Sequence, residues 1–68
     1  MAPDDPYITY GMACVHARIG NVDDGLRHLE RAVDEGFAHR EWLENDPDLD
    51  SLRADAGFER LLQKCGAD

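Results

Sequence analysis

The sequence has little of what marks secreted or membrane-bound proteins. Among 68 residues there are only two cysteines, Cys14 and Cys65, and no Cys-x-x-Cys motif, so we expect free thiols in a reducing compartment. No apolar run approaches the ~20 residues of a membrane span. The first residues carry neither the basic nor the apolar region of a secretory signal. These absences predict a cytoplasmic protein.

Positive charge and aromatic bulk are scarce as well. Seven Lys and Arg stand against fifteen Asp and Glu, which gives a formal net charge of −8. Nucleic acids and anionic membranes attract cationic surfaces, so we expect neither as a partner. Little core volume comes from aromatic residues, which are one Trp, two Tyr and two Phe. The apolar fraction of 43% is nevertheless close to that of typical globular domains. We expect one domain over residues 1–68 with marginal stability.

Helical spacing fills the first half of the chain. Pro6 suits the first turn of a helix, and Gly20 suits its end. Between them, four apolar residues fall within about 60° of one another on a helical wheel and predict a core-facing stripe. These residues are Ile8, Met12, Val15 and Ile19. Asn21 then begins a second helix as its N-cap, and Gly36 ends that helix.

A connection as short as Gly20-Asn21 forces the two helices to be antiparallel and directly packed. The second helix carries its own apolar stripe: Val22, Leu26, Leu29 and Val33. Phe37 follows the glycine stop and is expected to pack back over the last turn. The first half therefore predicts a helical hairpin.

The second half is more broken. A short helix over 38–45 carries Trp42, Asp46-Pro47 caps a single turn, and Asp55 caps a last helix closed by Gly66. The last helix has apolar residues at helical spacing: Phe58, Leu61, Leu62 and Cys65. The expected class is all-α: a helical hairpin followed by a short helix, a single turn and a C-terminal capping helix. We expect Trp42 to be a core residue of this capping region.

Residues 6–39 resemble one tetratricopeptide repeat, a helix-turn-helix unit of 34 residues. The resemblance is carried by the turn Ile19-Gly20-Asn21-Val22-Asp23-Asp24, followed by Leu29 and Ala32. The chain departs from the family pattern at several positions. These are Thr9, Met12, Ala13 and His16 in the first helix, Gly25 where Ala is usual, and Phe37 where Pro is usual.

The remainder resembles the segment that closes many bacterial tetratricopeptide arrays. The matching motifs are Gly36-Phe37, Trp42-Leu43, the run Asp46-Pro47-Asp48-Leu49-Asp50-Ser51-Leu52-Arg53, and Phe58-Glu59-Arg60-Leu61-Leu62. The resemblance thus divides the chain into a repeat over 6–36 and a closing segment over 37–66. Repeats of this kind bind other proteins and carry no chemistry of their own, so the resemblance implies a protein or peptide partner.

The first helix has a second apolar stripe, about 130° from the first. Its residues are Tyr7, Tyr10, Cys14 and Ala17, with Arg18 at the edge. In tetratricopeptide proteins this face lines the groove that holds a partner peptide, so the resemblance implies that these five residues bind the partner. The alternative is that the closing helix folds back onto the stripe and makes it ordinary core.

Metal and catalytic sites are not indicated. The acids at 46, 48 and 50 resemble a calcium loop, but Ser51 and Gly57 stand where that loop needs Gly and Glu. Cys14 and His16 point about 160° apart on a helix, which does not suit zinc. No phosphate loop or nucleophile motif is present, so we expect no cofactor, no metal and no enzyme activity.

Residues 41–52 contain five acids and no base. This run is either a docking strip for a basic partner or a set of solvated caps and turns. We expect an adaptor or accessory subunit without activity of its own. Two alternatives stay open: a structural cap or self-assembling module, and a small regulatory subunit of a neighbouring enzyme. With so small a core, we also expect a homodimer, with Thr9, Ala13 and His16 of the first helix facing outward to permit it.

Overall fold

The computed structural model describes residues 5–65, and every regular element in that range is helical. The elements are α1 (Pro6–Arg18), α2 (Val22–Asp34), α3 (Arg40–Asn45), the 3-10 turn η1 (Pro47–Leu49), α4 (Asp50–Arg53) and α5 (Ala56–Lys64). The predicted all-α class, with a helical hairpin first, is confirmed. The predicted closing glycine, Gly66, lies outside the described residues. None of the helices described is long and apolar enough to cross a membrane.

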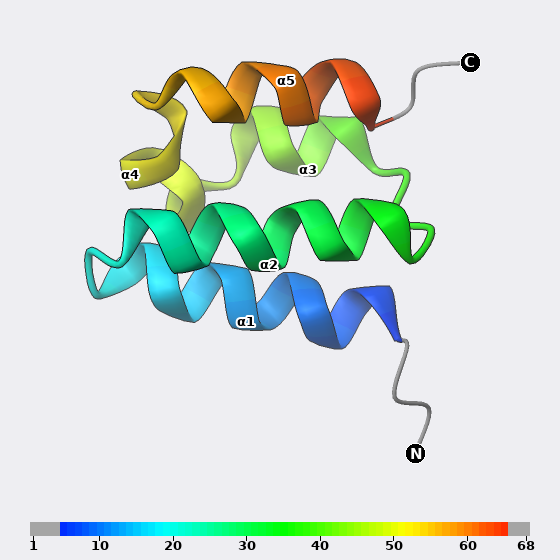
Figure 1. Cartoon of the computed structure of the whole chain (residues 1–68), viewed down its shortest axis with the longest axis horizontal. Coiled ribbons are helices and arrows are strands. Elements are labelled where there is room, and N and C mark those ends of the chain that lie inside the picture. The colour runs from blue at the N-terminus through cyan, green and yellow to red at the C-terminus, as the bar shows by residue number, and fades with distance from the viewer. Residues whose placement is uncertain (1–4, 66–68) are drawn as a thin grey trace.

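The turn between α1 and α2 is set by Gly20. Its φ of +86° is the left-handed conformation that glycine adopts without a steric penalty. There the Asn21 N–H donates to the His16 carbonyl over 2.8 Å, and the Gly20 N–H donates to the Ala17 carbonyl over 3.2 Å. These bonds satisfy carbonyls that the end of a helix leaves free. The result is the predicted antiparallel hairpin, visible as the blue-to-green pair in Figure 1.

Gly36 ends α2 in the same way, with φ of +115°. The N–H of Phe37 donates to the Ala32 carbonyl over 3.0 Å, which folds the chain back across the last turn of α2. Phe37 is thereby buried. The predicted helix end and the packing of Phe37 are both confirmed.

Aspartate caps organise the second half as predicted. The Asp46 carboxylate accepts the Asp48 N–H over 2.9 Å, and the Asp55 carboxylate accepts the Gly57 N–H over 2.8 Å. Each bond satisfies an N–H at a helix start. The chain therefore turns twice within ten residues and sends α5 back along α2.

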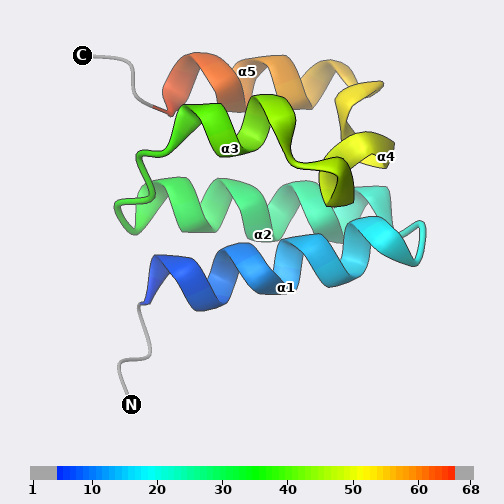
Figure 2. The ribbon, with the colours of Figure 1, turned by 180° about the vertical axis from the view of Figure 1, so that it is seen from behind.

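The helices form successive rows, with α2 in the interior. Figures 1 and 2 show α1 along one side of α2, α3 and α5 along the other, and η1 and α4 closing one end. The core lies between these rows and consists of Tyr10, Ala13, Ala17, Leu29, Ala32, Phe37, Leu43, Leu49, Leu52, Phe58, Leu61 and Cys65. On α5, three of the four predicted apolar residues are buried and Leu62 is partly buried, so its predicted face is confirmed.

For α1 the predicted core stripe is wrong. Its four residues are all exposed, and the buried face carries Thr9, Tyr10, Ala13 and Ala17 instead. The cause is close packing against α2. A Cβ added at Gly25 would lie 2.9 Å from the Leu52 side chain and 3.5 Å from the Ala13 carbonyl oxygen, so α1 and α4 both pack against the backbone of α2 at this glycine. Ala13 occupies that contact, and the larger aliphatic residues of the predicted stripe lie on the outer side of the helix.

Two further expectations are corrected. Trp42 is 43% exposed, because α3 buries Leu43 in the core and leaves the neighbouring indole at the surface of the fold. Thr9 and Ala13, expected to face a second copy, are buried within the chain. The Thr9 hydroxyl donates to a carboxylate oxygen of Glu35 on the C-cap of α2 over 2.7 Å.

Candidate functional site

The main unpartnered apolar surface among the described residues lies on the outside of α1. Ile8, Met12, Val15 and Ile19 are 51%, 47%, 57% and 67% exposed, and we call this set the outer stripe. They follow one another at helical spacing, so they form one continuous face rather than scattered positions. A continuous exposed apolar face of this kind marks interaction sites in soluble proteins. Sequence reasoning identified these residues but assigned them to the core.

The structure separates the five residues expected to bind a partner. Tyr10 and Ala17 are only 6% and 3% exposed, which assigns them to the core, the second of the two interpretations of this stripe. Cys14 is partly buried beside them. Tyr7 and Arg18 remain exposed. The element that covers this side of α1 is not the closing helix, as predicted, but η1 and α4, where the Ser51 hydroxyl donates to the Ala17 carbonyl over 2.7 Å.

An aromatic cluster holds α1 against the start of the closing segment. The rings of Tyr10 and Phe37 are stacked with centroids 4.5 Å apart, and Trp42 meets Tyr10 edge-on at 5.8 Å. Tyr7 joins from the rim, where its Oη lies 2.8 Å from Nε2 of His39. Offset and edge-on ring pairs of this kind each contribute about 1 kcal/mol beyond the burial of area. The cluster is therefore a structural joint, with one face of Trp42 open to solvent.

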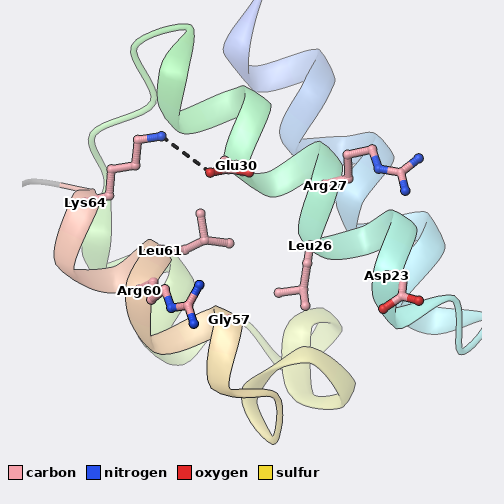
Figure 3. Close-up of a pocket in the computed structure, with 8 residues that line it drawn as sticks. All are labelled: Asp23, Leu26, Arg27, Glu30, Gly57, Arg60, Leu61 and Lys64. Carbon is pink, nitrogen blue, oxygen red and sulfur yellow. Dashed lines mark ion pairs between the residues drawn. The ribbon is translucent and has the colours of Figure 1, made fainter.

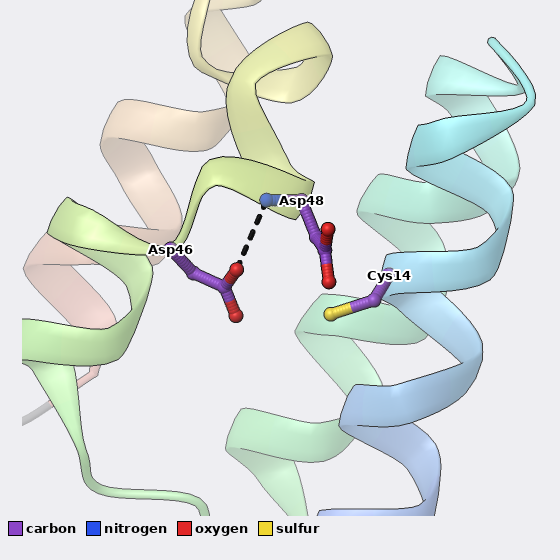
Figure 4. Close-up of side chains that lie close together, drawn as sticks. All are labelled: Cys14, Asp46 and Asp48. Carbon is purple, nitrogen blue, oxygen red and sulfur yellow. Dashed lines mark hydrogen bonds between the residues drawn. The ribbon is translucent and has the colours of Figure 1, made fainter.

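Cys14, Asp46 and Asp48 come together in space, with one ligand atom from each lying within 4.8 Å of the others (Figure 4). Sequence spacing could not reveal this cluster, because Cys14 and Asp46 belong to separate elements far apart along the chain. Both oxygens of Asp46 are already in use: Oδ1 accepts the Asp48 N–H, and Oδ2 accepts the Tyr10 hydroxyl over 2.6 Å. The arrangement caps η1 and anchors Tyr10, and we assign it no ion.

The surroundings of Cys14 disfavour the thiolate form of its side chain. Burial, together with the negative charges of Asp46 and Asp48, raises its pKa from the ordinary value of 9.0 to about 11. Burial and the hydrogen bond to Asp46 likewise raise the pKa of Tyr10. A nucleophilic cysteine needs the opposite, a depressed pKa beside a cation or a helix N-terminus. Cys14 is thus a packing residue at neutral pH.

An open groove of about 390 Å³ runs between α2 and α5 (Figure 3). Leu26 and Leu61 line it, and charged residues stand along its rim. Lys64 contacts Glu30 over 3.6 Å and also contacts Asp34, whose hydrogen bond raises the pKa of the lysine. The rim therefore carries charges of both signs, with Lys64 paired to acids of α2 and with Arg27 and Arg60 beside it.

Two histidines from separate helices meet between α1 and α2. The rings of His16 and His28 are stacked with centroids 4.8 Å apart. His28 donates through Nδ1 to the Asp24 carbonyl over 2.8 Å, while Nδ1 of His16 is buried without a partner among the residues described. Zinc needs three or four converging ligands, and this pair supplies two.

The acids of residues 41–52 each contact a group within the chain. Besides Asp46, they pair as follows: Glu41 with His39, Glu44 with Arg40, Asp48 with Arg18, and Asp50 with Arg53. Paired and capping acids present less free charge to an approaching basic partner than the sequence run suggests. This favours the interpretation of the run as caps and turns.

Comparison with known proteins finds one sequence similarity, to a segment of a longer protein. The chain is similar to a chloroplastic protein of Arabidopsis thaliana, with 34% identity over 56 residues. The similar region covers 82% of this chain and 17% of that relative, so the chain spans about one sixth of the protein it matches. No protein-family model matches the chain, and no solved structure matches it. This similarity does not establish a family.

Proposed function

We propose that this chain is a non-catalytic protein-interaction module, an adaptor or accessory subunit whose partner docks on the outer stripe of α1. The observation that carries the proposal is the exposure of four large apolar side chains on one continuous face of one helix. Exposing them costs free energy that burial against a partner would recover, at about 25 cal/mol per Å². The partner is a protein or a peptide with an apolar face.

The tetratricopeptide resemblance is part of this proposal. The hairpin with its glycine turn, the capped closing segment and the interaction role are all what that resemblance implies. The protonated thiol of Cys14 supports a role without catalysis, and so does the groove rim, where Lys64 is paired with Glu30. Free thiols at Cys14 and Cys65 suit the reducing cytoplasm, where we propose that the protein acts.

A capture experiment with matched variants tests the proposal. Immobilised wild-type chain, Met12→Glu and Ala56→Glu are each exposed to cell extract, and circular dichroism verifies the helicity of all three. Ala56 is exposed on α5 at the opposite side of the fold, so Ala56→Glu adds the same charge away from the stripe. We expect proteins retained by wild type and Ala56→Glu to be lost with Met12→Glu. Identical captured sets from all three chains would contradict the proposal.

Two other roles remain alternatives: a small regulatory subunit of a neighbouring enzyme, and a structural or self-assembling module. The first differs from an adaptor only in what the partner does, so the same surface would serve it. The second is favoured by a specific feature of the outer stripe, its internal symmetry, which bears on the nature of the partner.

A further inference from the structure

We propose that the occupant of the outer stripe is a second copy of this chain, with the two α1 helices packed antiparallel about a two-fold axis. This inference rests on the proposed function for the choice of surface and adds the identity of the partner. Closed two-fold dimers are the commonest oligomers of soluble proteins, and their interfaces are self-complementary. The outer stripe meets that requirement in its spacing and its charge.

The spacing of the stripe is the same in both directions. Its members Ile8, Met12, Val15 and Ile19 are separated by four, three and four positions. An antiparallel copy centred between Met12 and Val15 therefore sets Ile8 against Ile19 of the second copy, and Met12 against Val15. The four-three-four pattern is also the one that packs as a seam between two helices. Every large side chain on the stripe thus meets an apolar counterpart.

Charge also favours a second copy at this face. The chain carries −8 overall, yet residues 6–19 contain one arginine and no acid. Two copies that meet through α1 therefore bring together their least negative helices, whereas α2 carries four acids against two arginines and would repel its copy. A basic partner finds no carboxylate on the stripe itself. The outer stripe therefore suits an apolar partner surface, and the α1 helix of a second copy carries such a surface.

The stripe would form the centre of a small dimer interface, with its neighbours on α1 completing the contact. Its four side chains are each about half exposed, so they supply only part of the ~800 Å² that each partner buries in a standard interface. Gly11 lies beside the stripe, exposed in mid-helix, and a Cβ added there would meet no atom within 4 Å. Nothing within the described residues requires a glycine at this position. A second helix approaching closely would use the space, as backbones do at glycines.

Pairs of charged variants test the identity of the partner. One chain carries Met12→Lys with Val15→Lys, and the other carries Met12→Glu with Val15→Glu. By light scattering at about 150 mM salt, where repulsion between distant surface charges is screened, we expect a doubled mass for wild type, a single-chain mass for each variant alone, and a doubled mass for their mixture. A wild type that keeps the single-chain mass at several hundred micromolar would overturn the inference.

The register is tested by disulfide formation in a Cys14→Ala background. We expect the double variant Ile8→Cys with Ile19→Cys to form covalent dimers under mild oxidation, while neither single variant forms a covalent dimer. In the proposed register, two copies of position 8 lie about 16 Å apart along the axis, too far to bridge. Equal cross-linking of the singles and the double would overturn it. Loss of captured proteins with Met12→Glu from a strictly monomeric chain would overturn the inference and leave the proposed function standing.

Discussion

The hydroxyl of Tyr10 donates a hydrogen bond over 2.6 Å to Oδ2 of Asp46, across 36 positions of sequence. The same carboxylate caps η1 through its other oxygen. One aspartate thus starts the closing turn and also anchors it to the first helix. The consequence is that α1 and the closing segment share one core, and that Tyr10 is part of it.

Removing the Tyr10 hydroxyl tests this joint. We expect Tyr10→Phe to lower the free energy of unfolding by about 1–2 kcal/mol, since a hydrogen bond to a charged acceptor is lost from a part-buried site. Tyr7→Phe is the control, because Tyr7 is 53% exposed and its bond to His39 lies at the surface, so its cost should stay below about 0.5 kcal/mol. Urea unfolding measures both. Equal losses would show that the Asp46 bond has no special weight.

Arg53 should be irreplaceable by lysine. Its guanidinium donates to the carbonyls of Leu43 and Asp46 over 2.8 and 2.6 Å and pairs with Asp50. A lysine cannot reproduce this fork, so Arg53→Lys should cost about 2 kcal/mol. The exposed Arg27 pairs with Asp24 at the surface, and Arg27→Lys should change stability by less than about 0.5 kcal/mol. A thermal melt compares the two, and a silent Arg53→Lys would be the contrary result.

Trp42 should behave as a joint residue rather than a core residue. With 43% of its surface exposed, Trp42→Ala should cost about 1–2 kcal/mol, less than the ~3–5 kcal/mol of a fully buried aromatic. Phe37→Ala provides that comparison, because Phe37 is 2% exposed in the same cluster. Wild-type tryptophan emission should lie between the buried and the fully solvated extremes. A loss for Trp42→Ala as large as for Phe37→Ala would restore the core assignment.

Stability should fall at alkaline pH. The folded state holds the proton of Cys14 more tightly than the unfolded chain, because its pKa is raised, so the thiol's contribution is complete below pH 9.0 and is lost as pH rises toward about 11. After allowance for solvent screening we expect a fall of about 1–2 kcal/mol. Tyr10 adds to the fall at higher pH, since its pKa is also raised. Denaturant midpoints between about pH 8 and pH 11 should change less in Cys14→Ala than in the wild type. The same pH dependence in both proteins would show that the fall does not come from Cys14.

Two glycines should respond in opposite ways to alanine. At Gly11, in mid-helix with open space beside it, alanine should raise the stability of the monomer by about 0.5–1 kcal/mol through helix propensity. At Gly20, with φ of +86°, alanine is strained and should lower stability by about 1 kcal/mol or more. Melts at low micromolar concentration measure both. A destabilising Gly11→Ala under those conditions would reveal a constraint absent from the isolated fold.

The starts and ends of the helices could be predicted from the residues alone. Gly20 and Gly36 end their helices because only glycine adopts the required positive φ at no cost, and Asp46 and Asp55 begin turns because their carboxylates reach an N–H two residues on. On α5 the apolar residues occupy one arc with polar residues elsewhere, so periodicity identified the buried face. These features depend on neighbours in sequence and need no knowledge of the fold.

The orientation of α1, and with it the candidate site, could not be predicted in this way. Helix α1 carries apolar residues on more than one face. Its periodicity is therefore compatible with two core faces, the outer stripe or the arc of Tyr10, Ala13 and Ala17. The choice depends on contacts between distant residues: Ala13 packs against the backbone of α2 at Gly25, and Asp46 accepts the Tyr10 hydroxyl. Burying that arc leaves the larger residues of the outer stripe in solvent, because one helix at the edge of a fold has only one face to bury.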